Sequence, residues 1–483
     1  LAGTHLLGID LHPVHDREQY FRIIADYAAA HSELPVLSGG GWFGDVFDGG
    51  LPTATELDAI VSDRPVILFS HDAHGVWTNT RALQLAGIDT STPDPVDGRI
   101  VRDADGRPTG MLLEGAASPA AALIPDPDSA FLERAMLAAQ QRLHSVGITA
   151  WQDAAVGMSD IGPDPLPVYE SLDRRGLLTA RVVTALWWDR NRGLEQIQQF
   201  EAVRERLRSS ARLDGGTVKV MLDGMVENRT ASMLSPFVGH PDDRGLAFFS
   251  DEDATALTVA LDAAGFQIHF HAVGDAAVRT ALDALAAARV ANGPSSNRHH
   301  IAHLDVVDPA DFDRFSEVDA TANVSALWAR LDEEIVTRKL PLLGPEREQH
   351  HFPFGSISRA GARIVGGSDW PVTDPNPLWA VKTAVTRKGV PEDPHAVGDE
   401  VLTTPLLAHE SVGLGIALDA YTSEAAYVNR LDECGSLRVG AFADLVWIDR
   451  DLRDIDGLGS ARVLLTVVAG EPVYSADEDQ PAR

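Results

Sequence analysis

The sequence has 483 residues, which is enough for one large enzyme domain with smaller additions. Its 45% hydrophobic and 23% charged residues are typical of folded globular proteins and exclude collagen-like, disordered and low-complexity classes. The 40 Lys and Arg against 71 Asp and Glu give a net charge of −31, which disfavours nucleic acid and anionic membrane surfaces as partners.

Strands and amphipathic helices alternate along most of the chain. Apolar periodicity and capping residues predict helices over 16–30, 129–146, 195–208, 250–265, 275–290 and 377–386. Buried-type strands are predicted over 65–70, 147–153, 217–223, 266–271, 320–325 and 362–369, with a further strand that ends at His303. This order is typical of α/β proteins and favours a closed (β/α)8 TIM-type barrel over an open sheet.

Two regions interrupt the alternation. Residues 39–116 are rich in Gly, Pro, Asp and Thr and contain a hairpin-like stretch at 98–113, which indicates an inserted subdomain. Short strands at 443–449 and 463–468 indicate the C-terminal part of a small β-sandwich domain. The predicted division is therefore 1–38 for the start of the barrel with its first helix, 39–116 for the insert, 117–430 for the barrel and 431–483 for the β domain.

Lys219 lies in a strand in which Val218, Val220 and Leu222 share one face. Period-two alternation therefore places Lys219 on the opposite face, toward the barrel interior. An unpaired ammonium there is costly, so the lysine is expected to be paired, deprotonated or chemically converted. A salt bridge to a neighbouring acid is one reading, and a functional lysine, acting as a base or carbamylated to bridge metals, is the other.

His269 and His271 share one face of the following strand, and His271 lies at its C-terminal end. Catalytic residues of such barrels lie at the C-terminal rim, so His271 is the better metal ligand and His269 is expected to support it. Histidines at this spacing also occur as hydrogen-bonded core residues.

His303 and Asp369 each close a later strand. Taken alone, either residue could be structural. The ordered set of Lys219, His271, His303 and Asp369, one from each of four strands, predicts a site for Zn²⁺ or a similar divalent ion, one or two in number. Asp369 would accept a proton from metal-activated water and pass it to a leaving group, as general base and then acid.

Several motifs resemble the amidohydrolase superfamily, and within it the amidohydrolase family 3 branch that includes N-substituted formamide deformylase. Residues 74–79, preceded by Asp72, are similar to the Asp-x-His-x-x-Trp-x-Asn signature of that branch. Segments 103–114, 271–277, 367–372 and 435–445 resemble its hairpin, its fifth and eighth barrel strands and its returning β domain. The resemblance extends over nearly the whole chain.

This resemblance implies roles for the four strand-end residues. Lys219 would carry a CO2-derived carbamate that bridges two metals, His271 and His303 would ligate the second metal, and Asp369 would bind the first and act as the base. The family also has a first barrel strand with a His-x-His pair, which this sequence is expected to lack. Truncation or degeneration would account for this, and the intact later motifs favour truncation.

The expected function is that of a metal-dependent amidohydrolase, which cleaves a non-peptide C–N bond of the amide or formamide type in a small molecule. One alternative is a non-catalytic or regulatory relative with an incomplete metal site. Another is a barrel that uses Lys219 for Schiff-base chemistry. The residues expected to line the substrate pocket are Asp72, His74, Trp77, Asp223, Trp328 and Trp370.

Partners and compartment follow from composition. The single cysteine, Cys434, excludes an intrachain disulfide and favours a cytoplasmic location. No stretch is apolar for long enough to predict a membrane helix. We expect a small-molecule substrate, a homodimer, and neither nucleic acid nor membrane as partner.

Overall fold

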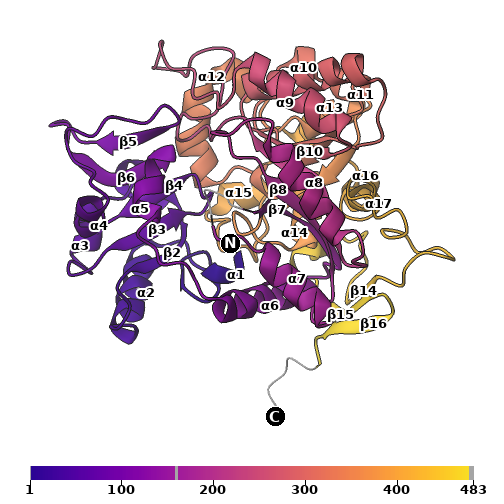
Figure 1. The fold of residues 1–483 in the computed structure, drawn as a ribbon, viewed down its shortest axis with the longest axis horizontal. Helices are drawn as coiled ribbons and strands as arrows, with labels where there is room; N and C mark the ends of the chain where they lie inside the picture. The colour runs from indigo at the N-terminus through magenta and orange to yellow at the C-terminus, as the bar shows by residue number, and fades with distance from the viewer. Residues whose placement is uncertain (1, 158–161, 478–483) are drawn as a thin grey trace.

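The computed structural model describes residues 2–157 and 162–477. A parallel seven-stranded sheet in the order β13-β12-β11-β10-β9-β8-β7 curls into the barrel at the centre of Figure 1. Its strands are β7 (Ala150–Val156), β8 (Arg181–Trp187), β9 (Leu213–Met221), β10 (Gln267–Ala272), β11 (His300–His303), β12 (Thr321–Val324) and β13 (Ile364–Gly366). Edge strands β7 and β13 do not pair with each other in the part of the chain described. The parallel strand order and the covering helices confirm the predicted TIM-type fold, and the described strands form a curled half-barrel rather than the closed barrel that was predicted.

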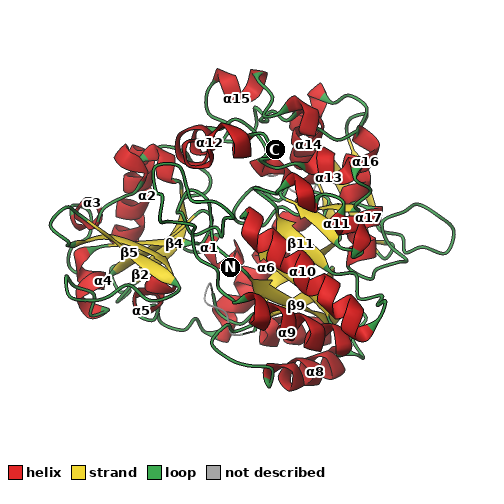
Figure 2. Ribbon diagram, turned by 90° about the horizontal axis from the view of Figure 1, so that it is seen from above, coloured by secondary structure: helices red, strands yellow, loops and turns green. Residues whose placement is uncertain are grey.

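Most of the helices after residue 128 cover the outer face of this sheet (Figure 2). The longer ones are α6 (Ser129–Ser145), α7 (Leu166–Arg174), α8 (Gln196–Leu207), α9 (Asp251–Ala263), α10 (Asp275–Asn292), α12 (Leu340–Glu348) and α14 (Pro377–Thr386). Shorter ones are α11 (Arg314–Glu317), α13 (Phe354–Arg359), α15 (Asp399–Thr403), α16 (Leu414–Ala420) and α17 (Ser423–Val428). Helices α12 and α15 lie beyond the sheet (Figure 2). Among the described helices, none combines the length and the apolar character needed to cross a membrane.

The alternation along β9 and β10 has the predicted sense. Val218, Val220, Ile268 and Phe270 are fully buried in the hydrophobic cluster that also contains residues of the covering helices. The intervening side chains therefore face the barrel interior. Register pairs Lys219 with His269, and His269 with His300, so these three residues lie at one level across neighbouring strands.

Local signals at the helix starts explain why these segments fold as they do. The Ser250 hydroxyl accepts the Asp253 N–H at 3.1 Å before α9. Asp16 accepts the Gln19 N–H at 2.8 Å before α2 (Arg17–Ala30). Both side chains satisfy an amide that has no partner inside its helix.

A six-stranded sheet forms a separate N-terminal domain, which Figures 1 and 2 show beside the barrel. Its strands are β1 (Ile9–Asp10), β2 (Leu37–Trp42), β3 (Val66–Ser70), β4 (Gly75–Thr78), β5 (Gly98–Arg102) and β6 (Pro108–Glu114). The short helices are α1 (Ala2–His5), α3 (Ala54–Asp58), α4 (Thr80–Leu85) and α5 (Ser118–Ala121). The predicted hairpin at 98–113 corresponds to the antiparallel pair β5 and β6.

The boundary predicted at residue 39 differs from the structure. The helix assigned to the barrel is α2, and its Tyr20 and Ile24 are fully buried in the same cluster as Leu37 and Leu68 of the N-terminal sheet. It connects parallel strands β1 and β2, so it belongs to the N-terminal domain. Periodicity located the helix but carried no information about the sheet that its apolar face covers.

The C-terminal residues form a three-stranded antiparallel sheet, β14 (Leu445–Ile448), β15 (Val463–Val468) and β16 (Glu471–Ser475). The two strands predicted there are β14 and β15. The described residues give one layer rather than both layers of a sandwich. This sheet is attached to the barrel by the buried ion pair of Arg181 with Asp444 and by the Thr466 hydroxyl, which donates to the His144 carbonyl at 2.7 Å.

Candidate active site at the carboxyl ends of the barrel strands

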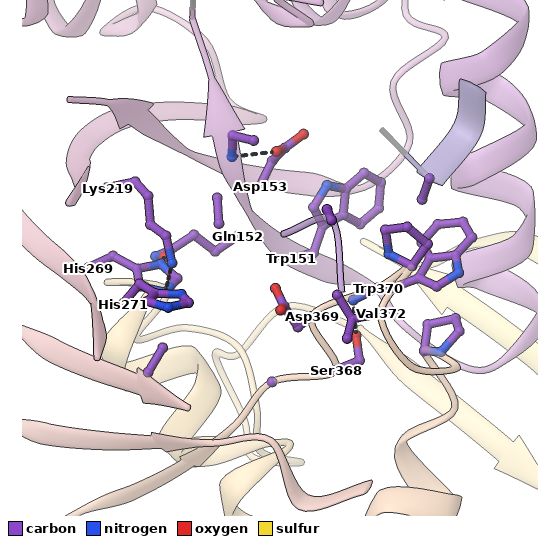
Figure 3. Close-up of a pocket in the computed structure, with 18 of the residues that line it drawn as sticks. Trp151, Gln152, Asp153, Lys219, His269, His271, Ser368, Asp369, Trp370 and Val372 are labelled. Atoms are coloured by element: carbon purple, nitrogen blue, oxygen red, sulfur yellow. Dashed lines mark hydrogen bonds between the residues drawn. The ribbon is translucent and has the colours of Figure 1, made fainter. Parts of the chain in front are cut away.

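A cavity of about 480 Å³ extends from the barrel interior to the N-terminal domain. Both edge strands, β7 and β13, contribute to its wall. Figure 3 shows Lys219 and His271 entering it from one side and Asp369 from another. Seven of the predicted site residues line it: Lys219, His271, His303, Asp369, Asp72, His74 and Trp370.

Lys219 is buried, and its Nζ lies 3.3 Å from Nε2 of His269 on the neighbouring strand. Burial lowers the pKa of Lys219 to about 8, although Asp369 acts in the opposite direction. A minor fraction of this amine, about a tenth at pH 7, is therefore unprotonated. The neutral amine is the form that can act as a base or react with CO2.

His269 is held by a chain of amides beneath the site. Its Nδ1 lies 2.7 Å from Oε1 of Gln152, whose Nε2 donates to Asn429 at 3.0 Å. An amide oxygen can only accept, so Nδ1 carries the proton and Nε2 presents its lone pair to Lys219. His269 therefore positions Lys219, whereas the sequence predicted that it would support His271.

His271 and His303 face each other, with ring centroids 4.4 Å apart. Both side chains are buried, and burial holds the pKa of each well below its ordinary value. Both imidazoles are therefore neutral, which is the form that binds metal ions. His303 has a left-handed φ of 81°, an uncommon conformation that the end of β11 must maintain.

Asp369 also has a left-handed φ, 54°, in the turn that follows β13. Its Oδ2 lies 4.0 Å from Nδ1 of His303. Desolvation within the protein raises the pKa of this carboxyl, although the positive charge of Lys219 acts in the opposite direction. A less acidic carboxylate is a better proton acceptor, as the predicted base requires.

The donor chemistry of these residues suits a divalent ion such as Zn²⁺, because two neutral imidazoles and a carboxylate are common ligands. Lys219 adds a group that becomes a ligand only after loss of its proton or conversion to a carbamate. Within residues 2–157 and 162–477, however, no three His, Cys, Asp or Glu side chains converge as a complete metal-binding set. The described residues therefore provide part of a ligand set.

His74 enters the same cavity from the N-terminal domain. Its Nδ1 lies 3.0 Å from a carboxylate oxygen of Glu114, which also accepts the Thr230 hydroxyl at 2.7 Å. Burial lowers the pKa of His74, but the Glu114 carboxylate outweighs burial and raises it to about 9. His74 is therefore a cation whose ring lies 5.1 Å from that of His271. Sequence reasoning gave Glu114 no role, although its position at the end of β6 was a usable signal.

Asp72 and Trp370 also line this cavity. Asp72 accepts the Ser70 hydroxyl and the His74 N–H, the latter at 3.0 Å, so it fixes the loop that carries His74.

Three residues predicted to contact substrate lie outside this cavity. Trp77 is fully buried in the N-terminal core and donates to the Thr53 carbonyl at 2.8 Å. Asp223 is fully buried and accepts three backbone N–H groups, those of Ser232, Val273 and Gly274. Trp328 stacks on His303 with ring centroids 5.1 Å apart. Trp77 belongs to the motif in the insert, and Asp223 and Trp328 follow strand ends, but neither signal shows which side chains reach the cavity.

Comparison with known proteins agrees with this architecture. Residues 1–474 match the amidohydrolase family. The chain belongs to the amidohydrolase family. Proteins of this family are generally metal-dependent. The match makes this chain a hydrolase of the amidohydrolase superfamily.

Individual relatives cover most of the chain. Protein LONG AFTER FAR-RED 3 from Arabidopsis thaliana is 29% identical over 98% of this chain and 80% of its own length. N-substituted formamide deformylase from Arthrobacter pascens is 27% identical over 87% of this chain and 75% of its own length. The fold matches an uncharacterized metal-dependent hydrolase from Pyrococcus horikoshii OT3 with a TM-score of 0.66, at 22% identity over 90% of this chain and 80% of that one.

Proposed function

We propose that this protein hydrolyses the C–N bond of an amide or formamide-like small molecule, with Asp369 as general base and then general acid. The observation that carries the proposal is the meeting of Lys219, His271, His303 and Asp369 in one cavity at the carboxyl ends of four barrel strands. Active sites of such barrels lie at this end. The similarity to an N-substituted formamide deformylase supports this substrate class.

The proposed reaction balances with water as the co-substrate. Asp369 accepts a proton from a water molecule while the oxygen of that water bonds to the carbonyl carbon of the substrate. The tetrahedral adduct then loses the amine as the C–N bond breaks, and Asp369 returns the proton to the leaving nitrogen. A divalent ion, when bound by His271, His303 and Asp369, would lower the pKa of water toward neutrality.

His74 is proposed to stabilise the negative charge that develops on the carbonyl oxygen. It is a buried cation held in place by Glu114, so no reorganisation is needed when the charge appears. Lys219 is proposed to form a carbamate with CO2, in which an N–C bond forms and one proton is released. The lowered pKa of Lys219 favours this step, because only the neutral amine reacts.

The first experiment measures metal content of the purified 483-residue chain by plasma mass spectrometry, beside Lys219→Ala. A metal content that falls in the variant supports a site built on Lys219. A panel of N-substituted formamides is then assayed for release of formate and amine. Asp369→Asn should lower kcat by about 10²- to 10⁴-fold with a smaller change in KM, as expected for loss of a general base.

A second candidate function is that of a regulatory relative without catalysis. The incomplete ligand set of the described residues favours it, and one similar protein is named Exoenzymes regulatory protein AepA. Metal-free protein that releases no amine from the whole panel would support this candidate. Turnover that Asp369→Asn abolishes would exclude it.

A further inference from the structure

A second, smaller cavity of about 40 Å³ lies between the N-terminal domain and the rim of the barrel. Its wall combines Phe43 and His71 with residues of the loops that follow β9, β12 and β13. Val372 lines both cavities, and Trp328 of the smaller one stacks on His303 of the larger one. The small cavity is therefore a close neighbour of the proposed reaction site.

The charges around this cavity do not balance. Lys339 pairs with Asp305 at 2.7 Å, Arg338 with Glu334 at 2.5 Å, and Arg330 with both Asp332 at 3.1 Å and Asp393 at 2.5 Å. Glu227 also lies in the wall, and its closest approach to these cations is 3.6 Å, to the already paired Lys339. These three cations thus face five carboxyl groups, so the group has two more acidic than basic side chains.

Three of these carboxylates keep an oxygen without a hydrogen-bond partner among the described residues. Oδ1 of Asp305 is one, but Asp305 does not line the cavity. The other two are Oε2 of Glu227, which lies 3.6 Å from Nζ of Lys339, and Oε2 of Glu334, and both of these residues line it. Their side chains are only 2% and 7% exposed. Burial raises the pKa of Glu227, and that of Glu334 to about 8, so Glu334 is mostly protonated near neutral pH unless a further cation stabilises its ionised form. A buried acceptor without a partner is costly, which indicates that the cavity is built for a donor.

We propose that the small cavity binds a protonated primary amine at the far end of the substrate, with Glu227 and Glu334 as its hydrogen-bond acceptors. An ammonium group supplies both the missing donors and the missing positive charge. Phe43 and Trp328 add aromatic rings, which attract cations. The inference rests on the proposed function for the amide end of the substrate, and it adds the chemistry of the distant end.

The size of the cavity supports a primary amine. About 10–15 Å³ of cavity space is needed to hold one water molecule, so a cavity of about 40 Å³ has room for a small group such as an aminomethyl group. Water could donate to the two oxygens that line the cavity, but it has no positive charge with which to stabilise the ionised carboxylates. A cationic ligand supplies both the hydrogen-bond donors and the positive charge.

The test compares N-formyl α,ω-diaminoalkanes of increasing length with N-formyl alkylamines of the same lengths. Binding to the full chain is followed by rapid-mixing tryptophan fluorescence, before turnover. At the best length, the amine-bearing probe should bind about tenfold more tightly, the usual effect of a charged hydrogen bond. Glu227→Gln should abolish this preference, while Glu333→Gln, an exposed neighbouring carboxylate, should preserve it.

Equal binding of the two probe series, no binding at any length, or a preference that survives in Glu227→Gln would overturn the inference. If Glu227→Gln does not fold, Glu334→Gln provides the second variant, and the comparison of probes on the unaltered chain is decisive by itself. An amine preference without release of formate would contradict the proposed hydrolysis and leave the amine site established.

Discussion

Nζ of Lys219 lies 3.3 Å from Nε2 of His269, and Gln152 fixes the tautomer that turns the lone pair of His269 toward the lysine. Replacement of His269 by Leu removes this acceptor. We expect the carbamate signal of Lys219, read by NMR under ¹³C-labelled CO2, to fall about fivefold, as for loss of one hydrogen bond.

His269→Gln can still present an acceptor, so it should restore part of the signal. His409→Leu changes an exposed histidine and should leave the signal unchanged. A full carbamate signal in His269→Leu would show that His269 does not position Lys219.

The barrel was predictable because its strands and helices carry strong local signals. Capping by Ser250 and the alternation around Lys219 depend only on neighbouring residues, and both predictions agree with the structure. Strand β8 was missed, because its seven residues are all buried and show no alternation. The assignment of α2 to the barrel differs from the structure, because the sheet against which its apolar face packs is determined only when the chain folds.

Position at the ends of strands was enough to predict the core of the candidate site. Carboxyl ends of parallel strands meet at one edge, so Lys219, His271, His303 and Asp369 had to come together. Side-chain direction in the N-terminal sheet and in the loops was not predictable. The contacts that bury Trp77 of strand β4, and those that enclose the cavity beside Glu227, arise from segments far apart in sequence.

Trp77 is a core residue, so its replacement should affect stability rather than substrate affinity. Trp77→Ala should lower the free energy of unfolding by about 3–5 kcal/mol, the usual cost for a buried tryptophan. Denaturant unfolding measures this loss. Trp447→Ala, at a tryptophan that is 66% exposed, is the control and should have little effect. A stable Trp77→Ala with a raised KM would return Trp77 to the substrate pocket.

Gly366 at the end of β13 permits close packing of the Tyr421 ring. A Cβ at this position would lie 2.3 Å from a ring atom of Tyr421, so Gly366→Ala must move the ring or the strand that leads to Asp369. We expect a loss of about 1–3 kcal/mol in unfolding free energy. Gly413→Ala, where a Cβ meets nothing within 4 Å, is the matched control.

The combination of Gly366→Ala with Tyr421→Ala isolates this contact. Removal of the ring relieves the clash, so the double variant should lose less unfolding free energy than the sum of the losses in the two single variants. Strict additivity would place the effect of Gly366→Ala elsewhere.

The charge of His74 predicts a pH dependence with a definite sign. Its pKa is raised from 6.5 to about 9 in the folded protein, so its pairing with Glu114 stabilises the fold fully below pH 6.5. This contribution is lost as pH rises through about 9. If the cation also stabilises the reaction, kcat/KM should fall over the same alkaline range. Melting temperature and kcat/KM measured against pH test both statements.

His74→Gln removes the titrating group at similar size, and it should flatten both alkaline limbs. His409→Gln, at an exposed histidine whose nearest carboxylate is 3.5 Å away, should keep them. A melting limb that persists in His74→Gln would refute the ion pair with Glu114, and a kcat/KM limb that persists would refute the assistance of His74 to the reaction.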